Sequence, residues 1–212
     1  MNVIDIIREE IQEFNQNFWQ WFGQSKVVDR SGKPLKVYHG TQADFNEFKS
    51  ETGLMYFSKT PKYASQFATN PNIKSTISNS QKSVMPVYLS IQKPLDLLEF
   101  KNDFISSYEF AAELKNRGVN IDSHKLYDSP WGSKGFSNDT RVWQWIRFNA
   151  KYLLPIIKAG FDGIFMYEDA EISYDKKIQD VAYVVFEPTQ VKSAIGNNGE
   201  YDKTNPYIIK EN

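Results

Sequence analysis

The sequence predicts an α+β fold, because strand-like apolar runs lie toward both ends of the chain and segments with helical periodicity lie between them. The strand-like runs cover residues 35–41, 53–58, 84–91, 161–168 and 180–187. Helices that are inserted between groups of strands argue against a regular βαβ sheet. With 212 residues and a hydrophobic content of 41%, the chain is long and apolar enough to form one core.

The first element expected is an amphipathic helix over residues 3–22. Its apolar residues recur at steps of three and four, which places them on one helical face: Ile4, Ile7, Ile11, Phe14, Phe18 and Phe22. We therefore expect residues 1–24 to form a helix that packs on the core, and residues 25–212 to form a single domain.

A second helix is expected directly after the run at 53–58. Thr60 is a favourable N-cap, and Pro61 suits the first helical position, where its missing N–H is not needed. The next strand-like run contains Pro86, which predicts that this strand lies at an edge or carries a bulge.

A helical insertion is expected at about residues 100–160. Residues 104–117 have helical character and end at Gly118, and residues 139–159 form a second helical stretch that Pro155 is expected to kink. The following runs at 161–168 and 180–187 are joined by a charged connection, which predicts two neighbouring strands.

Composition excludes several functions. The chain has 25 basic and 26 acidic residues, so its overall charge does not favour nucleic acid or an anionic membrane. It has no cysteine, which excludes disulfides, thiolate metal sites and a cysteine nucleophile, and two histidines are too few for a histidine-based zinc site without carboxylates. We expect no metal. Charges throughout the N-terminal segment argue against a signal peptide or membrane span, and we expect a cytoplasmic protein.

Three segments carry candidate site residues. At the end of a strand, Gly40 can bring its backbone close to a ligand; the alternative is a turn glycine beside a structural histidine, His39. Tyr56 and Phe67, on a strand and the helix behind it, can enclose a flat ring; the alternative is that both belong to the core. Asp180 begins a strand and can project into a cleft, or it is a solvated charge that closes a hairpin.

Two further features have ordinary explanations. Trp131, Trp143, Trp145 and Phe148 can stack on the bases of a nucleic acid, but the core of the helical insertion is the favoured interpretation. Lys192 can contact a phosphate or be a solvated lysine in a turn.

Taken together and in order, "VYHGT", "GLMYFS" with its following helix, and "AYVVFEPTQVKSA" resemble the ADP-ribosyltransferase fold. The pattern is similar to the His-Tyr-Glu branch, which includes diphtheria toxin and the poly(ADP-ribose) polymerases. It most resembles the ADP-ribosyltransferase-like domains of bacteriophage and plasmid polyvalent proteins, over roughly residues 20–203. The resemblance implies a split antiparallel β-sheet core with an N-terminal helix and a helical insertion.

The resemblance also implies NAD⁺ as the substrate and a role for each site residue. His39 would hold a ribose hydroxyl, the Gly40 backbone would bind the nicotinamide carboxamide, and Tyr56 would stack on the nicotinamide ring. Phe67 stands where the family usually has a second stacking tyrosine, and stacking needs only the ring face. The remaining residues expected to line the pocket are Thr41, Phe57, Ser58 and Tyr63.

The sequence departs from the family at the catalytic carboxylate. Cleavage of the nicotinamide–ribose bond passes through an oxocarbenium-like state, which a carboxylate near the ribose stabilises. In the His-Tyr-Glu branch this acid directly precedes the tyrosine of the last conserved strand, a position that Ala182 occupies here. Residues two apart on a strand share a face, so Asp180 is the expected substitute. Weaker candidates lie in the adjoining hairpin: Glu168, Asp169 and Glu171.

The resemblance therefore predicts an NAD-dependent ADP-ribosyltransferase that modifies a macromolecule, with protein favoured as the acceptor and nucleic acid possible. The expected setting is the cytoplasm of a bacterial or phage-infected host cell. One alternative is a degenerate, non-catalytic NAD-binding or interaction domain, which Ala182 favours. Another is an RNA 2′-phosphotransferase-like enzyme, which would need a basic cleft.

Overall fold

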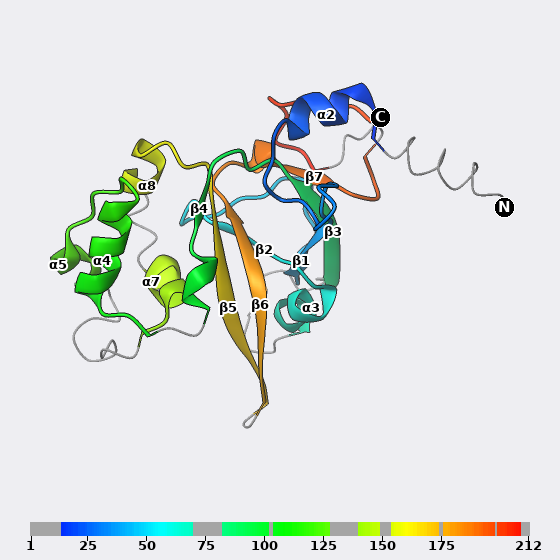
Figure 1. Cartoon of the computed structure of the whole chain (residues 1–212). Coiled ribbons are helices and arrows are strands. Elements are labelled where there is room, and N and C mark those ends of the chain that lie inside the picture. Colours follow the sequence, from blue (N-terminus) through cyan, green and yellow to red (C-terminus); the bar gives the residue numbers. More distant parts are fainter. Residues whose placement is uncertain are drawn as a thin grey trace.

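Seven strands form one sheet in the order β4-β5-β6-β2-β1-β3-β7 (Figure 1). The computed structural model describes residues 14–69, 82–101, 104–127, 140–148, 154–173, 176–197 and 199–208. Neighbouring strands are antiparallel except for β4 and β5, which are parallel. The predicted α+β class is confirmed, with a mixed sheet in place of a purely antiparallel one.

Each of the predicted strand-like runs forms a strand. These are β1 (Val37–Thr41), β2 (Met55–Ser58), β3 (Ser83–Leu89), β5 (Gly163–Ser173) and β6 (Lys176–Val185). β5 and β6 are antiparallel neighbours, as predicted. The strands that sequence reasoning missed are β4 (Pro94–Asp96) and β7 (Val191–Ser193), because three residues are too few to show a strand periodicity.

Side chains cap the starts of several helices, including α2 (Gln16–Phe22) and α3 (Pro61–Thr69). In α2, the Phe18 N–H donates to the Asn15 side chain at 2.9 Å. In α3, the Tyr63 N–H donates to the Thr60 hydroxyl at 3.4 Å, so the predicted N-cap is confirmed. The part of the predicted N-terminal helix before residue 14 lies outside the described residues.

The insertion contains four described α-helices. They are α4 (Ser107–Asn116), α5 (Ser123–Tyr127), α7 (Val142–Phe148) and α8 (Leu154–Lys158). The helical stretch predicted at 139–159 is thus described as two helices, and Pro155 lies in the first turn of α8. Proline is tolerated in a first turn, where its missing N–H has no partner to lose. Trp131 lies outside the described residues.

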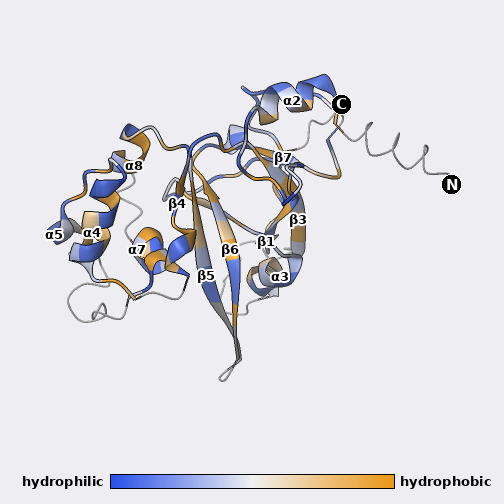
Figure 2. Ribbon diagram, in the orientation of Figure 1, coloured by the Kyte–Doolittle hydropathy of each residue, from blue (hydrophilic) through white to orange (hydrophobic). Residues whose placement is uncertain are grey.

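The insertion packs on one face of the sheet. Apolar residues that point to this face join the core of the insertion: Ile164, Met166, Ala182 and Val184. The opposite face carries Phe165, Tyr183 and Val185 and is covered by loop and tail residues such as Phe48 and Ile208. Figure 1 shows the insertion helices gathered beside β4 and β5, and Figure 2 shows that these helices carry both hydrophilic and hydrophobic residues.

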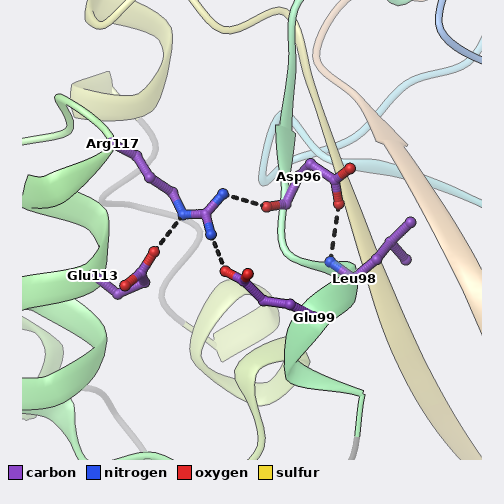
Figure 3. A network of polar contacts seen from close by, with 5 residues as sticks. All are labelled: Asp96, Leu98, Glu99, Glu113 and Arg117. Carbon is purple, nitrogen blue, oxygen red and sulfur yellow. Dashed lines mark hydrogen bonds and ion pairs between the residues drawn. The ribbon is translucent and has the colours of Figure 1, made fainter.

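Arg117 ties the insertion to the edge strand β4 (Figure 3). Its Nη1 donates to the Asp96 carbonyl at 2.6 Å, and its Nε pairs with Glu113 at 2.6 Å. The same guanidinium contacts Glu99, while the Asp96 carboxylate accepts a hydrogen bond from the Leu98 N–H at 3.0 Å. One planar cation therefore joins α4 to β4 and to the short 3₁₀ helix η1 (Leu98–Phe100).

The other end of the sheet is closed by α2 and the C-terminal tail. Phe18, Trp21 and Phe22 of α2 pack with Tyr88 of β3. Lys192 is buried, and its ammonium group donates to the carbonyls of residues 205 and 207 at 2.6 and 3.0 Å. Lys192 is therefore an anchor for the tail, and the interpretation of it as a solvated lysine in a turn was wrong. None of the helices in the described ranges has the length and apolar character needed to cross a bilayer.

The sheet splits between β1 and β2. These strands share one residue pair, Tyr38 with Ser58, whereas β1 stays paired with β3 along its whole length. Beyond that pair β1 and β2 diverge, which leaves a gap between Gly40 and Tyr56. The split predicted by the resemblance is thus a local separation within one sheet.

Gly40 is required by the packing of α3 on β1. A Cβ atom on Gly40 would lie 1.8 Å from the carbonyl oxygen of Ala64 in α3. Because that atom belongs to the backbone, no rotamer change relieves the overlap.

We therefore expect Gly40→Ala to destabilise the fold by about 2 kcal/mol, and the melting temperature to fall by about 4–8 °C. Thermal unfolding followed by circular dichroism measures this change. Lys62→Ala, on the exposed side of α3, is the matched control and should melt within about 2 °C of the wild type. Wild-type stability of Gly40→Ala would contradict the direct contact between α3 and β1.

Candidate functional site

A cavity of about 530 Å³ opens at the gap between β1 and β2. Most of the predicted site residues line it, namely His39, Gly40, Thr41, Tyr56, Phe57, Ser58 and Phe67. Tyr63 and Asp180, which were also predicted, do not. Four charged residues that were not among the leading candidates do: Arg147 from α7, Glu168 from β5, and the loop residues Glu47 and Lys49.

His39 bridges the gap. Its Nδ1 lies 2.8 Å from the carbonyl oxygen of Tyr56, and its ring packs at right angles to Phe48, with 4.9 Å between ring centroids. Burial lowers the pKa of His39 below its usual 6.5, and the hydrogen bond to the Tyr56 carbonyl opposes that shift. Because a carbonyl only accepts, the neutral ring carries its proton on Nδ1, and Nε2 is left as an acceptor.

The backbone of Gly40 faces the gap. The carbonyl of Pro86 accepts a hydrogen bond from the Ala194 N–H at 3.0 Å, so the backbone carbonyl of Pro86 points away from β1. In an antiparallel ladder, the backbone N–H and C=O of its partner Tyr38 then point toward β2. The same groups of Gly40, two residues further along the strand, point the same way. Gly40 therefore presents an N–H and a C=O where β2 has already separated. β3 lies between β1 and β7, so it is not the edge strand that Pro86 predicted. Pro86 has no backbone N–H, but at this position β1 does not need one.

Tyr56 is held between the sheet and the insertion. The guanidinium carbon of Arg147 lies 5.9 Å from the centre of the Tyr56 ring. The Tyr56 hydroxyl is buried and makes no hydrogen bond in the described part of the chain, and its pKa is raised, first by burial and then by the charge of Glu168. The ring is thus fixed on a strand, and the guanidinium of Arg147 lies over it.

Tyr63 supports the site from behind. It is 1% exposed, and its ring centroid lies 5.5 Å from that of Phe67, which does line the cavity. Its hydroxyl makes no hydrogen bond among the described residues, and burial, followed by the charge of Glu168, raises its pKa.

Asp180 caps α3. One oxygen of its carboxylate accepts hydrogen bonds from the N–H and the hydroxyl of Thr60, at 2.7 and 2.8 Å, and the other accepts from the Val181 N–H at 2.8 Å. These bonds occupy the carboxylate at the start of the helix, where negative charge is favourable. The expectation that it is a solvated charge is wrong, because Asp180 is buried.

Glu168 places a carboxylate in the cavity. It is 3% exposed and forms an ion pair with Arg147, with 2.8 Å between Oε1 and Nη1. Burial raises its pKa, and the positive charge of Arg147 opposes the rise. Across the β5–β6 ladder Glu168 lies opposite Asp180, two residues beyond the pair formed by Met166 and Ala182. The side chains of Glu168 on β5 and Ala182 on β6 therefore lie on the same face of the sheet.

The signal for Glu168 was present in the sequence but was weak. A glutamate that ends the apolar run 161–168 can be read as the solvated start of a hairpin, and only the register of β5 against β6 shows which face it takes. No sequence signal pointed to Arg147, because its role depends on the packing of the insertion. Its neighbour Trp145 belongs to the core, as the sequence favoured.

The charges that line the cavity balance. Arg147 pairs with Glu168, and Lys49 pairs with Glu47 at 3.2 Å. This is not the basic cleft that an RNA 2′-phosphotransferase-like enzyme would need. In the described ranges, no group of three or more acidic or histidine side chains is arranged to hold a metal ion.

A second cavity of about 500 Å³ lies beside α2, lined by Trp21, Phe161 and Phe186. Its central polar groups are used within the fold. Asp162 accepts hydrogen bonds from the backbone N–H groups of residues 92 and 93, and the Gln190 side chain bonds four backbone groups. The first cavity is therefore the better candidate for a site.

Comparison with family models identified one match. The family is described as ADP-ribosyltransferase in polyvalent proteins, and the match covers residues 29–201. A search of the curated proteins found no match, and a search of the solved structures found none either.

We expect NMR to show that His39 carries its proton on Nδ1 and titrates below 6.5. Because the unfolded chain takes up a proton near pH 6.5 while folded His39 stays neutral, stability should fall as the pH drops from 6.5 toward the folded pKa. Long-range ¹H–¹⁵N spectra of the imidazole report both quantities, and His39→Gln identifies the signal. Protonation on Nε2 would contradict the bridging hydrogen bond, and a pKa above 6.5 would contradict burial as the main influence on His39.

Asp180→Ala should lower the free energy of unfolding by about 2 kcal/mol, because Thr60 loses the acceptor of two hydrogen bonds at the start of α3. Asp180→Asn keeps an oxygen for Thr60 and should lose less. Urea unfolding of both variants measures the difference. Equal stability of Asp180→Ala and the wild type would show that Asp180 does not support α3.

Proposed function

Because the chain belongs to the family of ADP-ribosyltransferases in polyvalent proteins, we propose that it cleaves NAD⁺ and transfers the ADP-ribose to a macromolecular acceptor. The observation that carries this proposal is the meeting of four groups at one cavity. These are the Gly40 backbone, the Tyr56 ring, the acceptor nitrogen of His39 and the Glu168 carboxylate.

The nicotinamide end of NAD⁺ suits the gap between β1 and β2. Its carboxamide needs a donor and an acceptor side by side, which the N–H and C=O of Gly40 supply. Its flat ring suits the face of Tyr56, with Phe67 on the helix behind. A ribose hydroxyl can donate to Nε2 of His39, since Nδ1 is held by the Tyr56 carbonyl.

The reaction breaks the bond between C1′ of the ribose and the nicotinamide nitrogen. The bonding electron pair stays with the nitrogen, so nicotinamide leaves as a neutral molecule and positive charge develops on the ribose. A nucleophilic atom of the acceptor then bonds to C1′ and gives up its proton. Groups that hold the leaving ring and the ribose in line lower the entropic part of the barrier.

We assign the stabilising carboxylate to Glu168. A negative charge near the ribose helps the transition state more than the ground state, because the positive charge is then larger. Glu168 lines the cavity and shares the face of Ala182, whereas Asp180 is committed to Thr60. In this proposal the acid has moved from β6 to the adjacent strand β5.

The acceptor is a macromolecule, and we favour a protein. The balanced charge of the chain and of the cavity lining gives no electrostatic attraction for a nucleic-acid backbone. A non-catalytic NAD-binding domain is the second candidate, because Ala182 stands at the position of the family's acid. It predicts NAD⁺ binding without nicotinamide release.

We expect Glu168→Gln to lower the rate of nicotinamide release at least about 100-fold, because the neutral amide cannot offset the charge on the ribose. Asp180→Asn, corrected for its folded fraction, should stay within about threefold of the wild type. Nicotinamide release from NAD⁺, followed by chromatography, measures both rates. Transfer of labelled ADP-ribose to proteins in a cell lysate then tests the acceptor class.

The pair of variants separates the alternatives. Loss of activity in Asp180→Asn with full activity in Glu168→Gln would assign the carboxylate to β6 and overturn our assignment. Binding of NAD⁺ by the wild type without nicotinamide release would favour the non-catalytic domain. Circular dichroism of each variant excludes unfolding as the cause.

A further inference from the structure

We propose that Arg147 is a positioning residue that orients the Glu168 carboxylate, pairs with its charge and fixes the Tyr56 ring, so that the helical insertion completes the site formed by the sheet. This inference rests on the proposed function, since it concerns the same cavity. It assigns a functional role to the insertion, which otherwise only covers one face of the sheet.

The geometry around Arg147 joins three elements. Arg147 lies on α7, Glu168 on β5 and Tyr56 on β2. The guanidinium is 2.8 Å from the Glu168 carboxylate, and its central carbon is 5.9 Å from the centre of the Tyr56 ring. A planar guanidinium can hold a carboxylate and lie over an aromatic ring at once, which an ammonium group does less well.

The two partners of the ion pair differ in exposure. The Glu168 side chain is 3% exposed, whereas that of Arg147 is 44% exposed. Both residues line the cavity, so the buried carboxylate depends on Arg147 for its charge partner, while Arg147 is also partly solvated. A buried carboxylate that loses its cation takes up a proton more readily.

The insertion fixes the position of Arg147. Two residues earlier on α7, the buried Trp145 donates a hydrogen bond from Nε1 to the Ile105 carbonyl at 2.9 Å. Val142 and Ile146 of the same helix belong to the insertion core. The backbone of Arg147 is thus held by packing, and its side chain needs little further ordering to reach Glu168.

No other cation in the described part of the chain is paired with Glu168. The nearest acidic neighbour, Asp169, is paired with Arg141 at 2.8 Å, and Asp180 across the ladder is bonded to Thr60. The phenols of Tyr56 on β2 and Tyr63 on α3 face Glu168 as neutral groups, because burial raises the pKa of both. Removal of Arg147 leaves the carboxylate with acidic and neutral neighbours.

Loss of Arg147 should therefore act through the protonation of Glu168. The pKa of Glu168 is already raised by burial, and Arg147 is the first cause that lowers it. Loss of a neighbouring opposite charge raises the pKa of a carboxyl group by about 1–3 units. As the pH is lowered, we therefore expect the rate of nicotinamide release by Arg147→Gln to fall at a pH about 1–3 units higher than in the wild type.

The experiment follows Glu168 directly. Carboxyl resonances of ¹³C-labelled glutamate are titrated by NMR in the wild type, Arg147→Lys and Arg147→Gln, with Glu168→Gln to assign the signal. We expect the pKa of Glu168 to be lowest in the wild type, higher in Arg147→Lys and highest in Arg147→Gln. This readout needs no NAD⁺, so it holds or fails independently of the proposed activity.

The pH profile of nicotinamide release is measured in the same variants, with Arg117→Gln as the matched control. Arg117 is also a paired arginine of the insertion, but it binds β4 and η1 (Figure 3) and does not line the cavity. Arg117→Gln should lose stability without moving the Glu168 titration or the profile. If Arg147→Gln lowers the rate equally at every pH and leaves the Glu168 titration unchanged, Arg147 has only a structural role and the inference is overturned. If Arg147→Gln fails to fold, the Arg147→Lys titration decides.

Discussion

The separation of β1 from β2 after one residue pair is the constraint on which the site depends. It leaves the Gly40 backbone and the Tyr56 carbonyl without ladder partners, and buried backbone groups need partners. The His39 ring is the partner of the Tyr56 carbonyl, and it lies on the face of the sheet that Phe48 covers. On the other face, α3 lies directly on Gly40 and holds β1 in place. The gap is therefore a stable feature of the fold, and its open backbone groups are available to a ligand.

Two carboxylates face each other across the β5–β6 hairpin and have different partners. Asp180 accepts hydrogen bonds from backbone and hydroxyl groups and holds the start of α3. Glu168 has an arginine from the insertion and faces the cavity. Two neighbouring carboxylates can have different roles, because the hydrogen-bond and charge partners of each one determine whether it can interact with a ligand. The fold thus gives Asp180 a structural task, whereas Glu168 lines the cavity and is held by a cation from a separate part of the chain.

Much of this arrangement is readable from the sequence. The α+β class, the five longer strands, the start of α3 at Thr60 and the gathering of His39, Gly40 and Tyr56 follow from periodicity, capping and a resemblance spread along the chain. β4 and β7 are too short to leave a pattern. The choice between Glu168 and Asp180 needs the register of β5 on β6, and the place of Arg147 needs the docking of α7 on the sheet. Both are long-range facts that local sequence does not encode.

The central claim is that nicotinamide binds in the gap between β1 and β2. A titration of ¹⁵N-labelled protein with nicotinamide, followed through the backbone amide resonances, tests it most directly. Our account predicts that the largest shifts fall on Gly40 and Tyr56, and that Tyr56→Ala weakens the binding. Shifts centred on Trp21 and Phe161 at the second cavity, with Gly40 unchanged, would contradict it.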